Sequence, residues 1–215
     1  MQFDTAIFDL DGTLLNTLDD LADSVNHTLT QYGFPTRTRD EVRRFVGNGV
    51  PLLIERAVPE GTDRETQERC LAEFKKYYAE NMYHKTAPYP GIPELLTALG
   101  ARGVKIAVVS NKFDAAVKEL CRRYYGSSIH VAIGERADVR KKPAPDSVFR
   151  ALEELGASRE KALYIGDSDV DVQTAKNAGL TSVGVTWGFR ERALLEKEGA
   201  QYIIDTPAQM LDIIG

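Results

Sequence analysis

Cysteine and histidine are scarce in this sequence, and their few positions form no metal-binding pattern. The two cysteines, Cys70 and Cys121, belong to no Cys-x-x-Cys pair. The three histidines, His27, His84 and His130, lack the spacing of zinc ligands. The sequence therefore indicates neither a disulfide framework nor a zinc site. We expect both cysteines to be reduced thiols that pack as small hydrophobic residues.

Long hydrophobic runs and an excess of basic residues are also missing. No apolar stretch approaches the ~20 residues that a membrane helix needs, and the N-terminus has no basic segment followed by a long apolar one. The formal net charge of the 215 residues is -5, which gives no general affinity for nucleic acid or anionic membranes. We therefore expect a cytoplasmic protein that binds neither, as a monomer or homodimer.

The common glycine-rich phosphate-binding loops are absent as well. Gly47-Asn48-Gly49 has Leu52 where a dinucleotide-binding fingerprint requires its third glycine, and no strand is predicted before it. No GxxxxGK[ST] loop occurs anywhere in the sequence. A phosphate group would therefore have to be bound by other means.

Short β-rich runs alternate with helical patterns along most of the chain. Several runs are almost wholly apolar, such as KIAVVS at 105–110, which is typical of parallel strands covered on both faces. We predict strands at Thr5–Leu10, Val104–Ser110, Ile129–Gly134, Ala162–Gly166, Ser182–Thr186 and Tyr202–Ile204. We predict helices at Pro93–Arg102, Ala115–Tyr124, Ala144–Leu155, Asp169–Ala178, Glu191–Lys197 and Ala208–Ile213. This alternation predicts an α/β fold, with a Rossmann-like parallel sheet and helices on both faces.

One region, from about Thr17 to Tyr83, breaks the alternation because it contains helical patterns and no convincing strand. Candidate capping boxes mark three helix starts, at Thr17-x-x-Asp20, Thr38-x-x-Glu41 and Thr62-x-x-Glu65. We therefore predict an all-helical insertion at residues 16–84, within an α/β core domain made of residues 1–15 and 85–215.

Polar and charged residues follow the predicted strands at the end where open parallel sheets bind ligands. They are Asp9, Asp11 and Thr13 after the first strand, Ser110 and Asn111 after the second, Lys142 before the following helix, and Asp167 and Asp171 after the fourth strand. A carboxylate at the end of a buried strand costs several kcal/mol to desolvate unless something compensates it. The clustering therefore predicts a functional site at this edge.

Most of these residues also have a purely structural explanation. The alternatives are an Asp-Gly hairpin turn or a calcium loop at 9–12, a helix start at Ser110-Asn111, a solvated turn at Lys142-Pro143, and a helix-capping box at Ser168-x-x-Asp171. Asp167 is different, because it directly follows an apolar strand where structure alone requires no carboxylate. The case for a site depends on the set of residues more than on any single member.

Carboxylates without histidine or cysteine suit a hard cation, most simply Mg²⁺, which commonly binds substrate phosphates. We expect Asp167 to hold the metal, and Asp171 to orient a metal-bound water or pair with Lys142. We expect Asp9 to attack phosphorus and form an aspartyl-phosphate. Asp11, close to another acid, would keep a proton near neutral pH and donate it to the leaving alcohol.

The remaining polar residues are predicted to bind the substrate. Lys142 would offset the charge of a phosphomonoester dianion, while Ser110, Asn111 and Thr13 would hold its oxygens. The expected partner is therefore a small phosphorylated metabolite.

Four stretches, DLDGT at 9–13, SN at 110–111, KP at 142–143 and GDSDVD at 166–171, resemble the motifs of the haloacid dehalogenase superfamily in its phosphatase branch. The resemblance implies Asp9 as nucleophile, Asp11 as acid/base, and Ser110 and Lys142 as phosphate ligands. It also implies Mg²⁺ held by Asp9, the Asp11 backbone carbonyl and Asp167. The helical insertion resembles the family's helical cap.

Within this branch, FVGNGVPLLIERA at 45–57 and the run at 166–179 resemble phosphoglycolate phosphatases. The alternatives are a phosphomutase on sugar phosphates similar to β-phosphoglucomutase, an inorganic pyrophosphatase, or a non-enzymatic phosphate-binding signalling module. Thr13 favours hydrolysis, because mutases of this family tend to carry an aliphatic residue there. The presence of Asp11 disfavours both a true dehalogenase and a silent relative.

Overall fold

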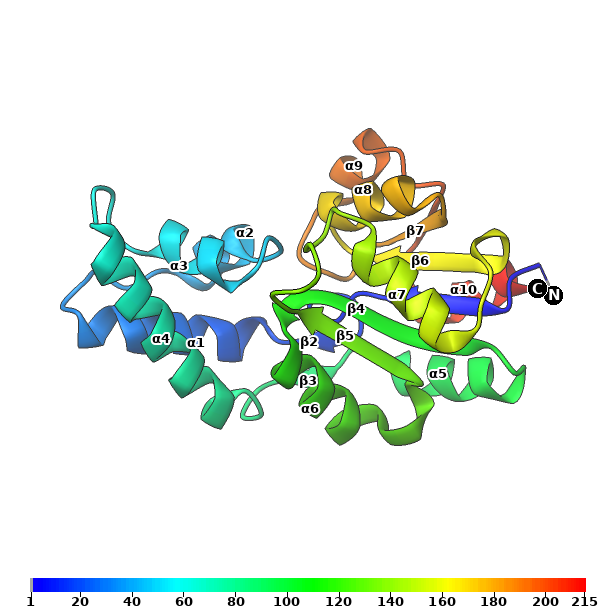
Figure 1. Ribbon diagram of the computed structural model, residues 1–215, viewed down its shortest axis with the longest axis horizontal. Helices are drawn as coiled ribbons and strands as arrows, with labels where there is room; N and C mark the ends of the chain where they lie inside the picture. Colours follow the sequence, from blue (N-terminus) through cyan, green and yellow to red (C-terminus); the bar gives the residue numbers. More distant parts are fainter. Residues whose placement is uncertain (1) are drawn as a thin grey trace. The chain divides into compact units, whose positions relative to one another are not determined.

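The computed structural model describes residues 2–215 (Figure 1). The chain forms two compact units, one of Met1–Leu15 with Pro88–Gly215 and one of Asn16–Ala87. The insertion was predicted to end at residue 84, whereas the helical unit ends at Ala87, three residues later. The chain passes from one unit to the other within two short strands, β2 (Leu15–Asn16) and β3 (Ala87–Pro88).

The core unit contains a six-stranded parallel sheet, which confirms the predicted α/β class. Its order is β5-β4-β1-β6-β7-β8, and every strand runs parallel to its neighbours. The strands are β1 (Thr5–Phe8), β4 (Lys105–Phe113), β5 (Val131–Glu135), β6 (Ala162–Gly166), β7 (Thr181–Val185) and β8 (Tyr202–Ile204). Because β1 pairs in parallel on both sides, the hairpin alternative for residues 9–12 is wrong.

Helices cover both faces of this sheet, which is why its central strands are apolar throughout. The core helices are α5 (Ile92–Ala101), α6 (Asp114–Tyr125), α7 (Asp146–Leu155), α8 (Asp169–Ala178), α9 (Arg192–Lys197) and α10 (Met210–Ile214). One face packs Ile7 and Val109 against Val148 of α7 and Ala175 of α8. The opposite-facing Phe8 is also buried, so neither face of β1 is exposed to solvent.

The helical unit consists of α1 (Leu18–Gln31), α2 (Arg39–Phe45), α3 (Val50–Ala57) and α4 (Arg64–Asn81). No strand interrupts the described residues from Thr17 to Tyr83, as predicted, and the next strand begins only at Ala87. The unit has its own apolar interior, which includes Leu21, Val25, Leu29, Ile54 and Phe74. Among residues 2–215, no helix combines the length and apolar composition that crossing a membrane requires.

The capping predictions for the helical unit were correct at one of three positions. Thr38 and Glu41 form the predicted capping box of α2. Helix α4 is capped by Asp63 instead of Thr62, because the Asp63 carboxylate accepts the Thr66 N–H at 2.9 Å. Thr17 makes no side-chain capping bond.

Asp20, the predicted capping partner of Thr17, has a different function in the fold. Its buried carboxylate accepts hydrogen bonds from the backbone N–H groups of Lys85 and Thr86, at 2.8 to 3.0 Å. These bonds connect the first helix of the unit to the last residues of the same unit.

Candidate functional site

The predicted site residues of the core unit come from the carboxyl ends of three adjacent strands. In the sheet, β1 lies between β4 and β6. Asp9 follows β1, Ser110 and Asn111 lie in β4, and Asp167 follows β6. Since these strands are parallel neighbours, residues far apart in sequence meet at one edge of the sheet.

Asp9 is fixed in place by its backbone and by a buried lysine. Its N–H donates to the Ile165 carbonyl at 2.9 Å, and its Oδ1 accepts the Leu10 N–H at 2.7 Å. The Lys142 Nζ lies 3.0 Å from the same Oδ1. Asp9 is nevertheless not fully enclosed, since 11% of its side chain is exposed. It is therefore an anchored carboxylate with an accessible edge, as a nucleophile requires.

Asp167 is held by the loop after β7 and by the segment after β1. The Phe189 N–H donates to its Oδ2 at 2.7 Å, and the Thr13 hydroxyl donates to its Oδ1 at 3.3 Å. Burial raises the pKa of Asp167 to about 8, and the negative charges of Asp171 and Asp9 add to this effect. Thr13, predicted to bind substrate, here contacts the acid that was predicted to hold the metal.

Asp171 both caps helix α8 and pairs with Lys142, two functions that the sequence left open. Its Oδ2 accepts hydrogen bonds from the Ser168 N–H and hydroxyl, which completes the capping box of α8. Its Oδ1 lies 2.7 Å from the Lys142 Nζ and 3.3 Å from the Tyr164 hydroxyl. Lys142 thus bridges Asp9 and Asp171 with 1% of its side chain exposed, so the solvated-turn alternative for this lysine is wrong.

Ser110 and Asn111 belong to β4, so the helix-start alternative is also wrong. The Asn111 side chain accepts the Lys142 N–H at 2.8 Å and donates to the Lys142 carbonyl at 3.0 Å. This pair of bonds holds the backbone from which Lys142 reaches the acids. The structure therefore assigns Asn111 a positioning contact, while its contact with substrate stays a prediction.

Lys112 was missed in the sequence. It is buried, and its Nζ lies 3.0 Å and 3.1 Å from the two carboxylate oxygens of Asp11. Asp11 therefore has an ammonium group as a close partner, in addition to the acid, Asp9, that was expected near it. The available signal was a lysine directly after Ser110-Asn111, two residues beyond the apolar run.

The acid cluster contains more negative charge than Lys142 alone offsets. Carboxylate oxygens of Asp9, Asp167 and Asp171 all lie within 4.8 Å of one another, and the three residues are buried. Burial raises the pKa of Asp9 to about 7, reinforced by Asp171 and Asp11 against the opposing effect of Lys142. For Lys142, burial would lower the pKa, but Asp171 and Asp9 raise it well above its ordinary value.

These residues fit a divalent cation. The donors are all oxygen atoms, the ligand type that Mg²⁺ prefers, and a cation would stabilise the charged forms of Asp9 and Asp167. Asp171 is already engaged by Lys142, Ser168 and Tyr164, which leaves Asp9 and Asp167 as the better direct ligands.

Glycine is required at several positions around the acids, and Gly12 and Gly166 are two of them. Gly12 has φ of +84°, and a Cβ there would lie 2.5 Å from Asp167 Oδ2. A Cβ at Gly166 would lie 2.3 Å from the Cβ and Cγ of Asp171. Any larger residue would displace a carboxylate from the cluster.

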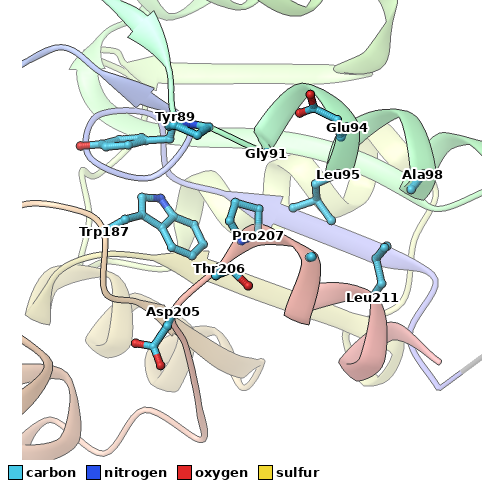
Figure 2. A pocket seen from close by; sticks show the side chains of 12 residues that line it. Tyr89, Gly91, Glu94, Leu95, Ala98, Trp187, Asp205, Thr206, Pro207 and Leu211 are labelled. Atoms are coloured by element: carbon cyan, nitrogen blue, oxygen red, sulfur yellow. The ribbon is translucent and has the colours of Figure 1, made fainter.

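A separate groove of the core unit has a volume of about 610 Å³ and mainly apolar walls (Figure 2). Figure 2 shows Trp187 facing Pro207 within it. The Trp187 Nε1–H donates to the Thr13 carbonyl at 3.0 Å, so one wall of the groove contacts the segment that carries the site. None of the clustered acids lines the groove.

Comparison with known proteins identifies the family of this chain. Residues 6–185 match the family described as haloacid dehalogenase-like hydrolase. The chain belongs to this family. Its membership identifies the protein as a hydrolase.

Several named proteins and solved structures are similar to this chain. The phosphoglycolate phosphatase of Aquifex aeolicus is 33% identical over 97% of this chain and 95% of its own length. That of Pseudomonas syringae pv. tomato is 35% identical over 93% and 75%. A crystal structure from Lactobacillus delbrueckii subsp. bulgaricus, provisionally named phosphoglycolate phosphatase, superposes with a TM-score of 0.94 at 36% identity, covering 100% and 99% of the two chains.

Proposed function

We propose that this protein is a Mg²⁺-dependent phosphatase that hydrolyses a small phosphomonoester through an aspartyl-phosphate on Asp9, with phosphoglycolate as the leading substrate. The observation that carries the proposal is the buried cluster of Asp9, Asp167 and Asp171, bridged by Lys142. The names of the similar proteins support the choice of phosphoglycolate.

In the first half-reaction the Asp9 carboxylate attacks phosphorus, and the bond from phosphorus to the leaving oxygen breaks. Asp11 gives a proton to that oxygen, so the leaving group departs as an alcohol. Ser110 and Lys142 hold the phosphoryl oxygens during transfer. The support for these roles is position, because all four residues come from the same end of the sheet.

In the second half-reaction Asp11 takes a proton from water as the water oxygen attacks phosphorus. The bond between phosphorus and Asp9 breaks, which releases inorganic phosphate and restores the carboxylate. When bound by Asp9, Asp167 and the Asp11 backbone carbonyl, Mg²⁺ would neutralise the phosphate and the acids around it.

The experiment measures phosphate release from phosphoglycolate and other phosphorylated metabolites, with Mg²⁺ and after metal removal by a chelator. We expect turnover only with the metal, and a loss of at least about 1000-fold in Asp9→Asn, since this variant lacks the nucleophile. Asp212→Asn, an exposed change in α10, is the matched control. Full activity in metal-stripped protein, or isomerisation without phosphate release, would contradict the proposal.

A further inference from the structure

Lys112 is a second buried lysine at the site, and the reaction outlined above gives it no function. It has 2% of its side chain exposed, while its partner Asp11 has 13% exposed. A buried ammonium group is costly to desolvate unless it is paired and hydrogen-bonded. Asp11 supplies that pairing, and Lys112 thereby places a positive charge beside the acid of the proposed reaction.

Strand β4 pairs irregularly with β5 around Lys112. Val109 of β4 pairs with Ile133 of β5, but the next pair is Phe113 with Glu135, so β4 contains extra residues between the two pairs. Side chains of a regular strand alternate between faces, and a bulge changes this alternation. Ser110, Asn111 and Lys112 lie in this irregular stretch and are all buried.

The place of Asp11 in the reaction defines what lies near Lys112. Asp11 must come within hydrogen-bond distance of the leaving oxygen, and the Lys112 Nζ is 3.0 Å from Asp11. One hydrogen bond joins Asp11 to the leaving oxygen and another joins Lys112 to Asp11, so the ammonium lies within about 6 Å of the leaving oxygen. A group attached to the carbon next to that oxygen is therefore within reach of Lys112.

An ammonium group can contact two carboxylates at once, because it has three N–H donors. Lys142 does so in this structure, where it bridges Asp9 and Asp171. A substrate that carries its own carboxylate would enter a site that already contains four aspartates. Such a substrate needs a cation on its leaving-group side, where Asp11 and Lys112 lie.

We propose that Lys112 binds the carboxylate of the leaving group, and that the site is therefore selective for phosphate esters of 2-hydroxycarboxylates. This inference rests on the proposed function, since it assumes that Asp11 serves the leaving oxygen. It assigns selectivity for the carboxylate to a residue of the core unit.

The test compares phosphoglycolate with ethyl phosphate, in which a methyl group replaces the carboxylate. Lys112→Met should lower kcat/KM for phosphoglycolate by about 10- to 100-fold more than for ethyl phosphate, mainly through KM. Lys112→Arg should keep most of the selectivity because it keeps the charge. The ratio between substrates is the decisive quantity, since any disturbance of Asp11 affects both esters alike.

Lys197→Met, an exposed change in α9, is the matched control, and thermal melts establish that each variant is folded. An equal loss for both esters in Lys112→Met would overturn the inference and leave Lys112 as a positioning residue for Asp11. Wild-type protein that hydrolyses both esters equally well would overturn it without any variant. Wild-type protein that hydrolyses neither ester with Mg²⁺ would instead refute the proposed function, and the inference with it.

Discussion

The two buried lysines of the site have different surroundings. Lys142 bridges two acids, Asp9 and Asp171, and its backbone is held by Asn111. Lys112 contacts the carboxylate of Asp11, which is more exposed than either acid beside Lys142. The difference is that Lys142 joins two carboxylates to each other, whereas the contacts described for Lys112 are with the single carboxylate of Asp11.

The largest effect is expected from Lys142→Met. It removes the shared partner of two buried carboxylates, which should cost roughly 3–5 kcal/mol of stability and lower Tm by about 6–20 °C. Turnover should fall at least about 100-fold. Thermal melts and phosphate-release assays beside Lys197→Met measure both effects. A variant as stable and active as the wild type would remove the basis for distinguishing Lys142 from Lys112.

Asp171→Asn should have the next largest effect. Asparagine keeps an oxygen that can accept the capping bonds from Ser168, but it removes the charge that faces Lys142. We expect a loss of about 1.5–3 kcal/mol, measured by denaturant unfolding. Ser168→Ala, which removes the cap and keeps the ion pair, is the companion variant. If it costs more than Asp171→Asn, Asp171 stabilises the fold mainly as a cap.

The stability of the metal-free protein should fall as pH rises. The pKa values of Asp9 and Asp167, about 7 and about 8, lie above the ordinary value of 3.8, so the folded state binds more protons than the unfolded state between these limits. Their contribution is complete below about pH 4 and is lost as pH rises through 7 and 8. We expect Tm to fall by at least about 5 °C between pH 5 and pH 8.

Mg²⁺ should raise Tm more at pH 8 than at pH 5, because protons compete with the metal for the same carboxylates. Asp167→Asn should reduce both the pH dependence and the response to Mg²⁺. Equal stabilisation by the metal at the two pH values would show that it binds elsewhere.

The smallest stability change is expected from Lys112→Met. Asp11 is partly exposed, so water can compensate the lost contact, and we expect a cost of about 1–2 kcal/mol, clearly below that of Lys142→Met. Parallel melts of the two methionine variants measure the difference. Equal costs would mean that the two lysines stabilise the fold to the same extent, whatever their functions in catalysis.

Much of the fold could be predicted because strong apolar periodicity coincided with clear end signals. The predicted bounds of β6, α8 and β8 match the structure. The end of β4 was predicted too early, at Ser110, since the apolar run stops there. The strand continues to Phe113 through polar residues and an irregular pairing with β5. The alternation of a regular strand cannot reveal this.

The site residues were identifiable because carboxylates after apolar strands are costly without a function. Their partners were harder to predict. The bonds from Asn111 to the Lys142 backbone, from Trp187 to Thr13 and from Phe189 to Asp167 join segments far apart in sequence. Such contacts depend on loop conformation, which composition and spacing do not determine.

The carboxylate of Asp20 has a consequence for how this family could diversify. By accepting the Lys85 and Thr86 N–H groups, it joins the entry and exit of the inserted helices through bonds internal to the insertion. An insertion closed on itself in this way makes few demands on its host beyond two nearby attachment points. Evolution can therefore exchange such a module while the sheet of the core unit stays unchanged.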